Sequence, residues 1–122
     1  MSDEAMDIEQ VARVSYEANR AIQKELGEEV SPPFKAATYL QINEVLQRVT
    51  NYLAGETSEE YHKSWVARKR DKGWVYGPAL NIPAKTHPNM VNYHDLPSDQ
   101  RLKDHMFETI VDAFKEGHEA DD

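Results

Sequence analysis

The chain has 122 residues, of which 39% are hydrophobic and 30% are charged, and its formal net charge is −8. This length suits one soluble domain with a modest core, and the acidic balance argues against duplex nucleic acid as a partner, because phosphates require a basic surface. No stretch approaches the ~20 apolar residues of a membrane span, the acidic first residues are unlike a secretory signal, and the chain has no cysteine for disulfides. We therefore expect a cytoplasmic protein without membrane attachment.

The charged residues are unevenly distributed along the chain. Eight of the 22 acidic residues lie in residues 1–10 and 116–122, whereas all 14 basic residues lie between residues 11 and 115. We interpret residues 1–122 as a single domain with acidic, flexible ends at about 1–6 and 117–122. One basic cluster stands out, and it consists of Lys63, Arg68, Lys69, Arg70 and Lys72. It is either a site for a small anion or a solvated helix face.

The first half of the chain predicts two amphipathic helices. Apolar residues at helical spacing predict a helix over residues 8–26, and Gly27 is expected to end it. Pro32 and Pro33 exclude a helix in the segment that follows. A second helix is predicted over residues 36–54, with Gly55 at its end. Its buried stripe is formed by Ile42, Val45, Leu46, Val49 and Leu53.

A third helix is predicted to begin near Ser58. Thr57 and Glu60 have the spacing of a capping box, and Gly73 ends the helix. His62, Trp65 and Lys69 lie three and four residues apart, so they share one face of this helix.

The remainder of the chain predicts a small β element and a last helix. Residues 74–76 are β-prone and are followed by Gly77-Pro78, and residues 90–91 are a candidate second strand. The last helix begins near Ser98 after a proline, and Gly117 is expected to end it. The predicted fold is therefore α+β and mostly helical, with about four helices and a two-stranded element between the third and the fourth.

A distinctive string of residues runs through the second half of the chain. It consists of His62-Lys63-Ser64-Trp65, Lys69, Gly73-Trp74-Val75-Tyr76-Gly77-Pro78, His87-Pro88, Tyr93, Leu96-Pro97 and Arg101. In order and spacing, this string resembles the ryanodine-receptor repeat (RyR) domain. Upstream segments resemble the stand-alone single-repeat form found in bacteria and their phages, namely Val11-Ala12-Arg13, Glu17-Ala18-Asn19-Arg20 and Pro32-Pro33-Phe34.

The resemblance implies a binding module and not an enzyme. In animal channels the repeats are paired, nucleotide-type ligands are associated with the pair, and the tryptophan of the third helix belongs to the ligand surface. A chain with one repeat is thus expected to form a homodimer or higher homo-oligomer that brings two copies of Trp65 together. Its expected ligand is a nucleotide-derived signal, which it would sense or, in a phage, sequester from host immune signalling.

Seven residues are candidates for contacting that ligand. Trp65 is expected to stack on a base, with Lys69 against a phosphate and His62 as a hydrogen-bond donor. By comparison with the family, Asn89 faces the pocket. The other candidates are the Tyr76 hydroxyl and, at the start of the last helix, Arg101 and Asp104.

Alternatives remain open at each of these positions. Trp65 is equally explained as a packing residue, and Arg101 and Asp104 as surface residues. No Gly-x-Ser-x-Gly motif, phosphate-binding loop or cysteine nucleophile is present, and His62, His87, His94 and His105 lack metal-site spacing. We therefore expect no catalytic residues, no metal and no cofactor. The rival hypotheses are a protein-interaction module without a small ligand and an enzyme that cleaves the nucleotide.

Overall fold

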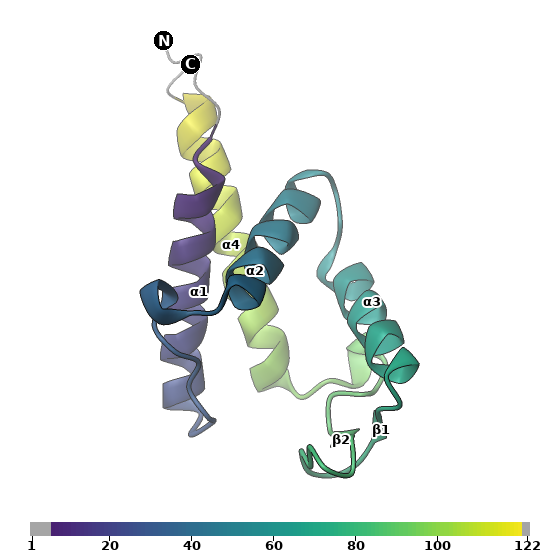
Figure 1. Cartoon of the computed structure of the whole chain (residues 1–122). Coiled ribbons are helices and arrows are strands. Elements are labelled where there is room, and N and C mark those ends of the chain that lie inside the picture. Colours follow the sequence, from purple (N-terminus) through teal and green to yellow (C-terminus); the bar gives the residue numbers. More distant parts are fainter. Residues whose placement is uncertain (1–5, 121–122) are drawn as a thin grey trace.

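A computed structural model describes residues 6–120 of the chain (Figure 1). Over these residues it contains four α-helices, two short 3-10 helices and one two-stranded sheet. In chain order the elements are α1 (Ile8–Glu25), η1 (Phe34–Ala36), α2 (Tyr39–Leu53), α3 (Ser58–Asp71), β1 (Val75–Tyr76), β2 (Thr86–His87), η2 (Tyr93–Asp95) and α4 (Ser98–Ala120). The predicted mostly helical α+β fold, with its β element between the third and fourth helices, is confirmed.

Local capping explains where α2 and α3 begin. The Thr38 side chain accepts from the Gln41 amide at the start of α2, and Thr57 accepts from the Glu60 amide at the start of α3. In both cases the third residue of the helix bonds back to the capping residue, which completes a capping box. Because Thr38 caps α2, the helix begins at Tyr39 and not at the predicted residue 36, which belongs instead to the separate turn η1.

The second strand is not where the sequence predicted it. Residues 90–91 are not a strand; Thr86–His87 pairs with β1 in parallel, with Val75 opposite Thr86. The close approach depends on Gly77, since a Cβ there would lie 2.5 Å from the Thr86 Cβ. Met90 is instead a buried core residue.

The predicted end of the last helix at Gly117 is also wrong. Helix α4 continues through this glycine as far as Ala120. A glycine inside a helix costs only about 1 kcal/mol relative to alanine, which a 23-residue helix tolerates. Of the acidic ends, residues 1–5 and 121–122 lie outside the described residues.

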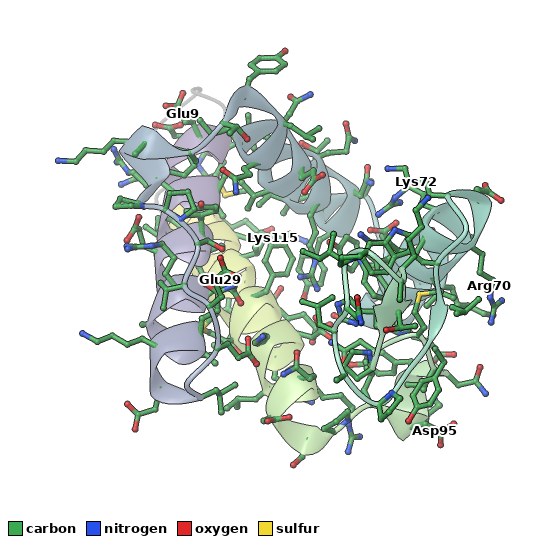
Figure 2. All side chains as sticks on the ribbon, turned by 60° about the horizontal axis from the view of Figure 1, so that its bottom comes forward. Glu9, Glu29, Arg70, Lys72, Asp95 and Lys115 are labelled. Atoms are coloured by element: carbon green, nitrogen blue, oxygen red, sulfur yellow. The ribbon has the colours of Figure 1, made fainter. Side chains whose placement is uncertain are left out.

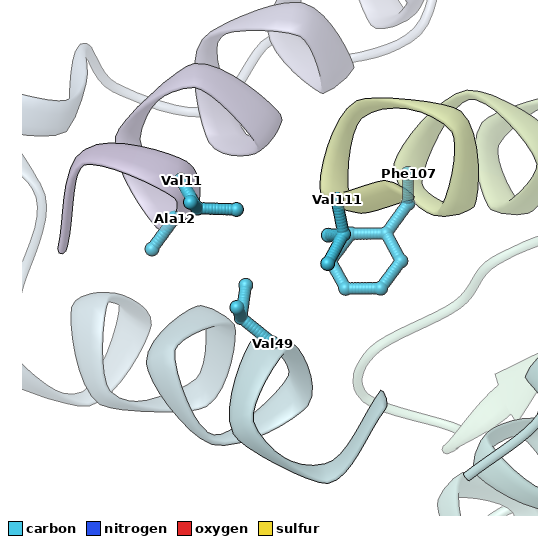
Figure 3. Packing of buried hydrophobic residues seen from close by; sticks show 5 residues of the cluster. All are labelled: Val11, Ala12, Val49, Phe107 and Val111. Carbon is cyan, nitrogen blue, oxygen red and sulfur yellow. The ribbon is translucent and has the colours of Figure 1, made fainter. Parts of the chain in front are cut away.

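Three helices form the hydrophobic core. Helices α1 and α4 run side by side in opposite directions, and α2 crosses them (Figure 1). Their shared interior contains Val11, Ala12, Val49, Phe107 and Val111 (Figure 3). Helix α3 lies to one side of this core.

Polar and aromatic contacts attach α3 to the other helices. Its buried residues are Ser58, His62 and Val66, so it offers little apolar surface. The Ser58 hydroxyl donates to the Glu108 carboxylate of α4 at 2.6 Å. The guanidinium of Arg48 on α2 lies 4.0 Å from the centre of the Tyr61 ring. This mode of attachment leaves room for a cleft beside α3.

We expect Val111→Ala to reduce the free energy of unfolding by about 1–3 kcal/mol, because it removes two methyl groups from a fully buried site. Val14→Ala is the matched control, since the Val14 side chain is 38% exposed on α1. Urea titrations of both variants measure the difference. Equal losses in the two variants would contradict this placement of the core.

Candidate functional site

A cleft of about 380 Å³ lies where all four helices meet. Aromatic side chains line it, namely Tyr16, Tyr61, His62, Trp65 and Phe107. Polar side chains also line it, among them Ser15, Asn19, Gln41, Glu44 and Gln100. Of the seven predicted ligand contacts, four lie at this cleft, and they are His62, Trp65, Asn89 and Asp104. The structure thus brings together these four residues, which helical spacing and the family resemblance had suggested.

Trp65 is half-buried between two histidines. The His62 ring stacks on the indole with a centroid separation of 5.7 Å, and the His87 ring meets it edge-on at 5.0 Å. His62 Nε2 lies 2.7 Å from the Val91 carbonyl oxygen, which only accepts, so Nε2 is the nitrogen that donates. The hydrogen bond that His62 was predicted to donate to a ligand is therefore made within the protein, and its Nδ1 is left as an acceptor when the ring is neutral.

His87 acts as an acceptor in its neutral form. Its Nδ1 accepts from the Asn89 amide N–H at 3.0 Å. Burial and then the positive charges of Lys69 and Lys103 lower the pKa of His87 below its ordinary value of 6.5. The neutral ring is thus the stable form in the folded protein at neutral pH.

Lys69 lies against two indole rings. Its ammonium is 4.5 Å from the centre of the Trp74 ring and 5.9 Å from that of Trp65. Both distances allow cation–π attraction. The Lys69 ammonium therefore lies beside the two indoles and does not line the cleft. The neighbouring basic residue Arg70 is exposed at the outer edge of α3 and directed away from the core (Figure 2).

Asp104 is paired with an arginine that the sequence did not single out. Asp104 Oδ1 accepts from Arg48 at 2.9 Å, and the two side chains are 15% and 17% exposed. The guanidinium lies between the Tyr61 ring at 4.0 Å and the Phe107 ring at 4.1 Å. The sequence could have indicated that Arg48 is partly buried, because it lies one turn after Val45 on the apolar face of α2.

Asn89 belongs to a hydrogen-bond network that crosses the edge of the cleft. Its side-chain amide donates to Gln100 Oε1 at 3.2 Å, and Gln100 Nε2 donates to Glu28 at 2.8 Å. Lys103 Nζ donates to the other Glu28 oxygen at 2.6 Å. Burial opposes ionisation of Glu28, but the bonds from Lys103 and Gln100 outweigh it and hold the pKa of this carboxyl below its ordinary value.

Tyr76 and Arg101 lie outside the cleft. Tyr76 is 58% exposed on β1 and faces a separate hollow of about 390 Å³, which it shares with Arg70, Trp74 and Met90. Arg101 is partly buried, and its Nε has no hydrogen-bond partner among the described residues. The structure thus divides the predicted set between the cleft, its rim and the β element.

Among residues 6–120, no three side chains of His, Asp or Glu come together as a metal site would require. No helix described there is both long and apolar enough to cross a membrane.

One protein family matches most of the chain. A family model described as the RyR domain matches residues 37–116. The chain belongs to the RyR domain family. The match begins just before α2 and ends within α4, so α1 lies outside it although α1 carries Ser15, Tyr16 and Asn19 on the cleft wall. In this RyR domain, the N-terminal helix completes both the core and the cleft.

We expect Arg48→Met to reduce the free energy of unfolding by about 2–3 kcal/mol, because it leaves the Asp104 carboxylate partly buried without its cation. The loss is smaller than for a fully buried pair, since both side chains keep some contact with water. Adding Asp104→Asn should recover part of it, because the unpaired charge is removed. A double variant that is as unstable as the sum of the singles would argue against a paired role.

We expect the stability of the domain to fall as the pH drops below about 6.5, with a slope of up to about 1.4 kcal/mol per pH unit from His87. The folded pKa is below the unfolded value of 6.5, so the contribution is complete above 6.5 and is lost as the pH falls through the folded value. His87→Asn, which keeps an acceptor without titrating, should flatten this slope. His105→Asn, at a side chain that is 67% exposed, is the matched control because it also replaces one histidine with asparagine.

Proposed function

We propose that this RyR domain is a non-enzymatic binding module for a nucleotide-derived small molecule, of the adenine nucleotide, ADP-ribose or cyclic nucleotide type. The observation that carries the proposal is the half-buried Trp65 on the wall of a cleft that also holds His62, Asn89 and Asp104. Any of the nucleobases can stack on an indole, because each has a flat π-face. The volume of the cleft is within the range of small-ligand pockets.

The polar lining of the cleft supports a nucleoside in particular. Asn19, Gln41 and Glu44 offer donors and acceptors suited to ribose hydroxyls and a base edge. The hydroxyl of Ser15 is buried at the cleft and has no hydrogen-bond partner among the described residues. Because a buried hydroxyl without a partner is unfavourable, a ligand group or water that bonds to it would stabilise this region.

The proposed phosphate position follows from the charges around Trp65. Among the described residues, the two cations on the cleft wall are Arg48 and Lys103, and each is bonded to a carboxylate. Lys69 lies just beyond the Trp65 indole, held by cation–π contacts. A phosphate attached to a base stacked on Trp65 would therefore be directed toward Lys69.

We also propose that the domain works as a homodimer or higher homo-oligomer in the cytoplasm, sensing the ligand or, if the protein is phage-encoded, sequestering it. Exposed apolar side chains on and after β1 are consistent with association, and they are Val75, Tyr76, Leu80 and Ile82. The same exposed side chains favour the second candidate function, a protein-interaction module without a small ligand.

We expect Trp65→Leu to weaken ligand binding by about 5- to 150-fold, the range of one base–aromatic stack. The measurement is titration calorimetry against adenosine, adenine nucleotides, ADP-ribose and cyclic oligonucleotides. Trp74→Leu is the matched control, because Trp74 is a second partly buried tryptophan that does not line the cleft. Chromatography of the ligand after incubation separates binding from turnover.

Three results would count against this function. An empty panel with a stoichiometric protein partner would favour the interaction module. Equal effects of Trp65→Leu and Trp74→Leu would remove Trp65 from the site. Conversion of the ligand to products would identify an enzyme.

A further inference from the structure

Glu28 reaches from the end of α1 across to α4. It follows Gly27, whose φ of +73° turns the chain out of the helix. One carboxylate oxygen accepts from Lys103 Nζ at 2.6 Å, and the other accepts from Gln100 Nε2 at 2.8 Å. The carboxylate is therefore held by both of its oxygens, as a bound anion would be.

The two donors are themselves held in place. Lys103 Nζ also donates to Gln100 Oε1 at 3.1 Å, and the Asn89 side chain donates to the same oxygen at 3.2 Å. These bonds orient the Gln100 amide so that its NH₂ group faces Glu28. The Lys103 side chain is only 18% exposed, so its charge is weakly screened by water.

The donors stand at the junction of two hollows. Gln100 and Lys103 line the cleft that contains Trp65, and they also line a second hollow of about 610 Å³. The second hollow extends along Leu80, His87 and Pro88. A ligand that spans both hollows would therefore contact the Lys103 ammonium at their junction.

We propose that Lys103 and Gln100 form an anion subsite, which the Glu28 carboxylate occupies until a phosphate group of a ligand displaces it. The identity of that ligand rests on the proposed function, whereas the subsite itself does not. A phosphate offers the same oxygen acceptors as a carboxylate and carries more charge, so it competes effectively for these donors.

Displacement requires only a rotation of the Glu28 side chain. The surrounding loop is held independently, because Arg20 Nε donates to the Ser31 carbonyl at 2.8 Å and the Ser31 amide donates to Gln23 at 2.9 Å. The Glu28 side chain is 32% exposed and can turn into water. The subsite would thus open without unfolding the loop.

The deciding variant is Glu28→Ala, with Glu29→Ala as its matched control. Glu29, which is labelled in Figure 2, is exposed, follows Glu28 in the sequence and lines the same second hollow. Both variants therefore remove one negative charge from one region. The first probe is inorganic phosphate, which needs no nucleoside site. The second is the pair ADP-ribose and adenosine, because ADP-ribose has one phosphate for Lys69 and another for this subsite. Titration calorimetry and the phosphate-dependent rise in Tm measure binding.

We expect Glu28→Ala to bind phosphate at least about tenfold more tightly than the wild-type chain, because the internal competitor no longer reduces the fraction of open subsites. Glu29→Ala should change the affinity less than about threefold, as a screened surface charge does. Adding Lys103→Met to Glu28→Ala should abolish the gain. ADP-ribose should gain affinity from Glu28→Ala, whereas adenosine should not.

The outcomes separate this subsite from the nucleotide function. If Glu28→Ala binds phosphate no better than Glu29→Ala, the subsite is wrong, even where Trp65-dependent nucleotide binding is found. If the phosphate gain appears but no nucleotide binds, the subsite stands and the nucleotide proposal fails. A gain that survives Lys103→Met would also overturn the assignment.

Discussion

The arrangement of the molecule depends on how Arg48 is held. Its guanidinium lies between the rings of Tyr61 and Phe107 and is bonded to Asp104, so a single side chain of α2 contacts both α3 and α4. Helix α3 has too few buried apolar residues to pack as a fourth member of the core. Arg48 and the bond between Ser58 and Glu108 hold it instead at the side of the three-helix core.

This mode of attachment determines the chemistry of the cleft. Trp65 is on a helix that only partly joins the core, and so its indole stays half-exposed beside polar residues of α1 and α2. The cations that line the cleft are balanced by internal carboxylates, Arg48 by Asp104 and Lys103 by Glu28. An anionic ligand at either cation would have to compete with a carboxylate of the protein, and Glu28 is the more exposed of these two carboxylates.

Features that depend on neighbouring residues could be predicted from the sequence. The capping boxes at Thr38 and Thr57 and the stripes of apolar residues define helices through interactions within one or two turns. The second strand could not be found this way, because its pairing depends on the close approach of Gly77 and Thr86 and on the positive φ of Lys85. Helix α4 passes Gly117 because the stop signal is weak and a long helical segment, which begins at Ser98, precedes it.

The candidate site shows the same division. His62 and Trp65 share a face of α3, so their spacing alone brings them together, whereas Asn89 was found only through the family resemblance. The pairs of Arg48 with Asp104 and Glu28 with Lys103 join residues 56 and 75 positions apart, a separation at which a sequence pattern carries no distance. Basic side chains on helices are usually solvated, but Arg48 and Lys103 are partly buried and each is paired with a carboxylate. Counting the positive charges of the sequence therefore overstates what the cleft offers an anion, and the relevant quantity is the strength of each internal pair.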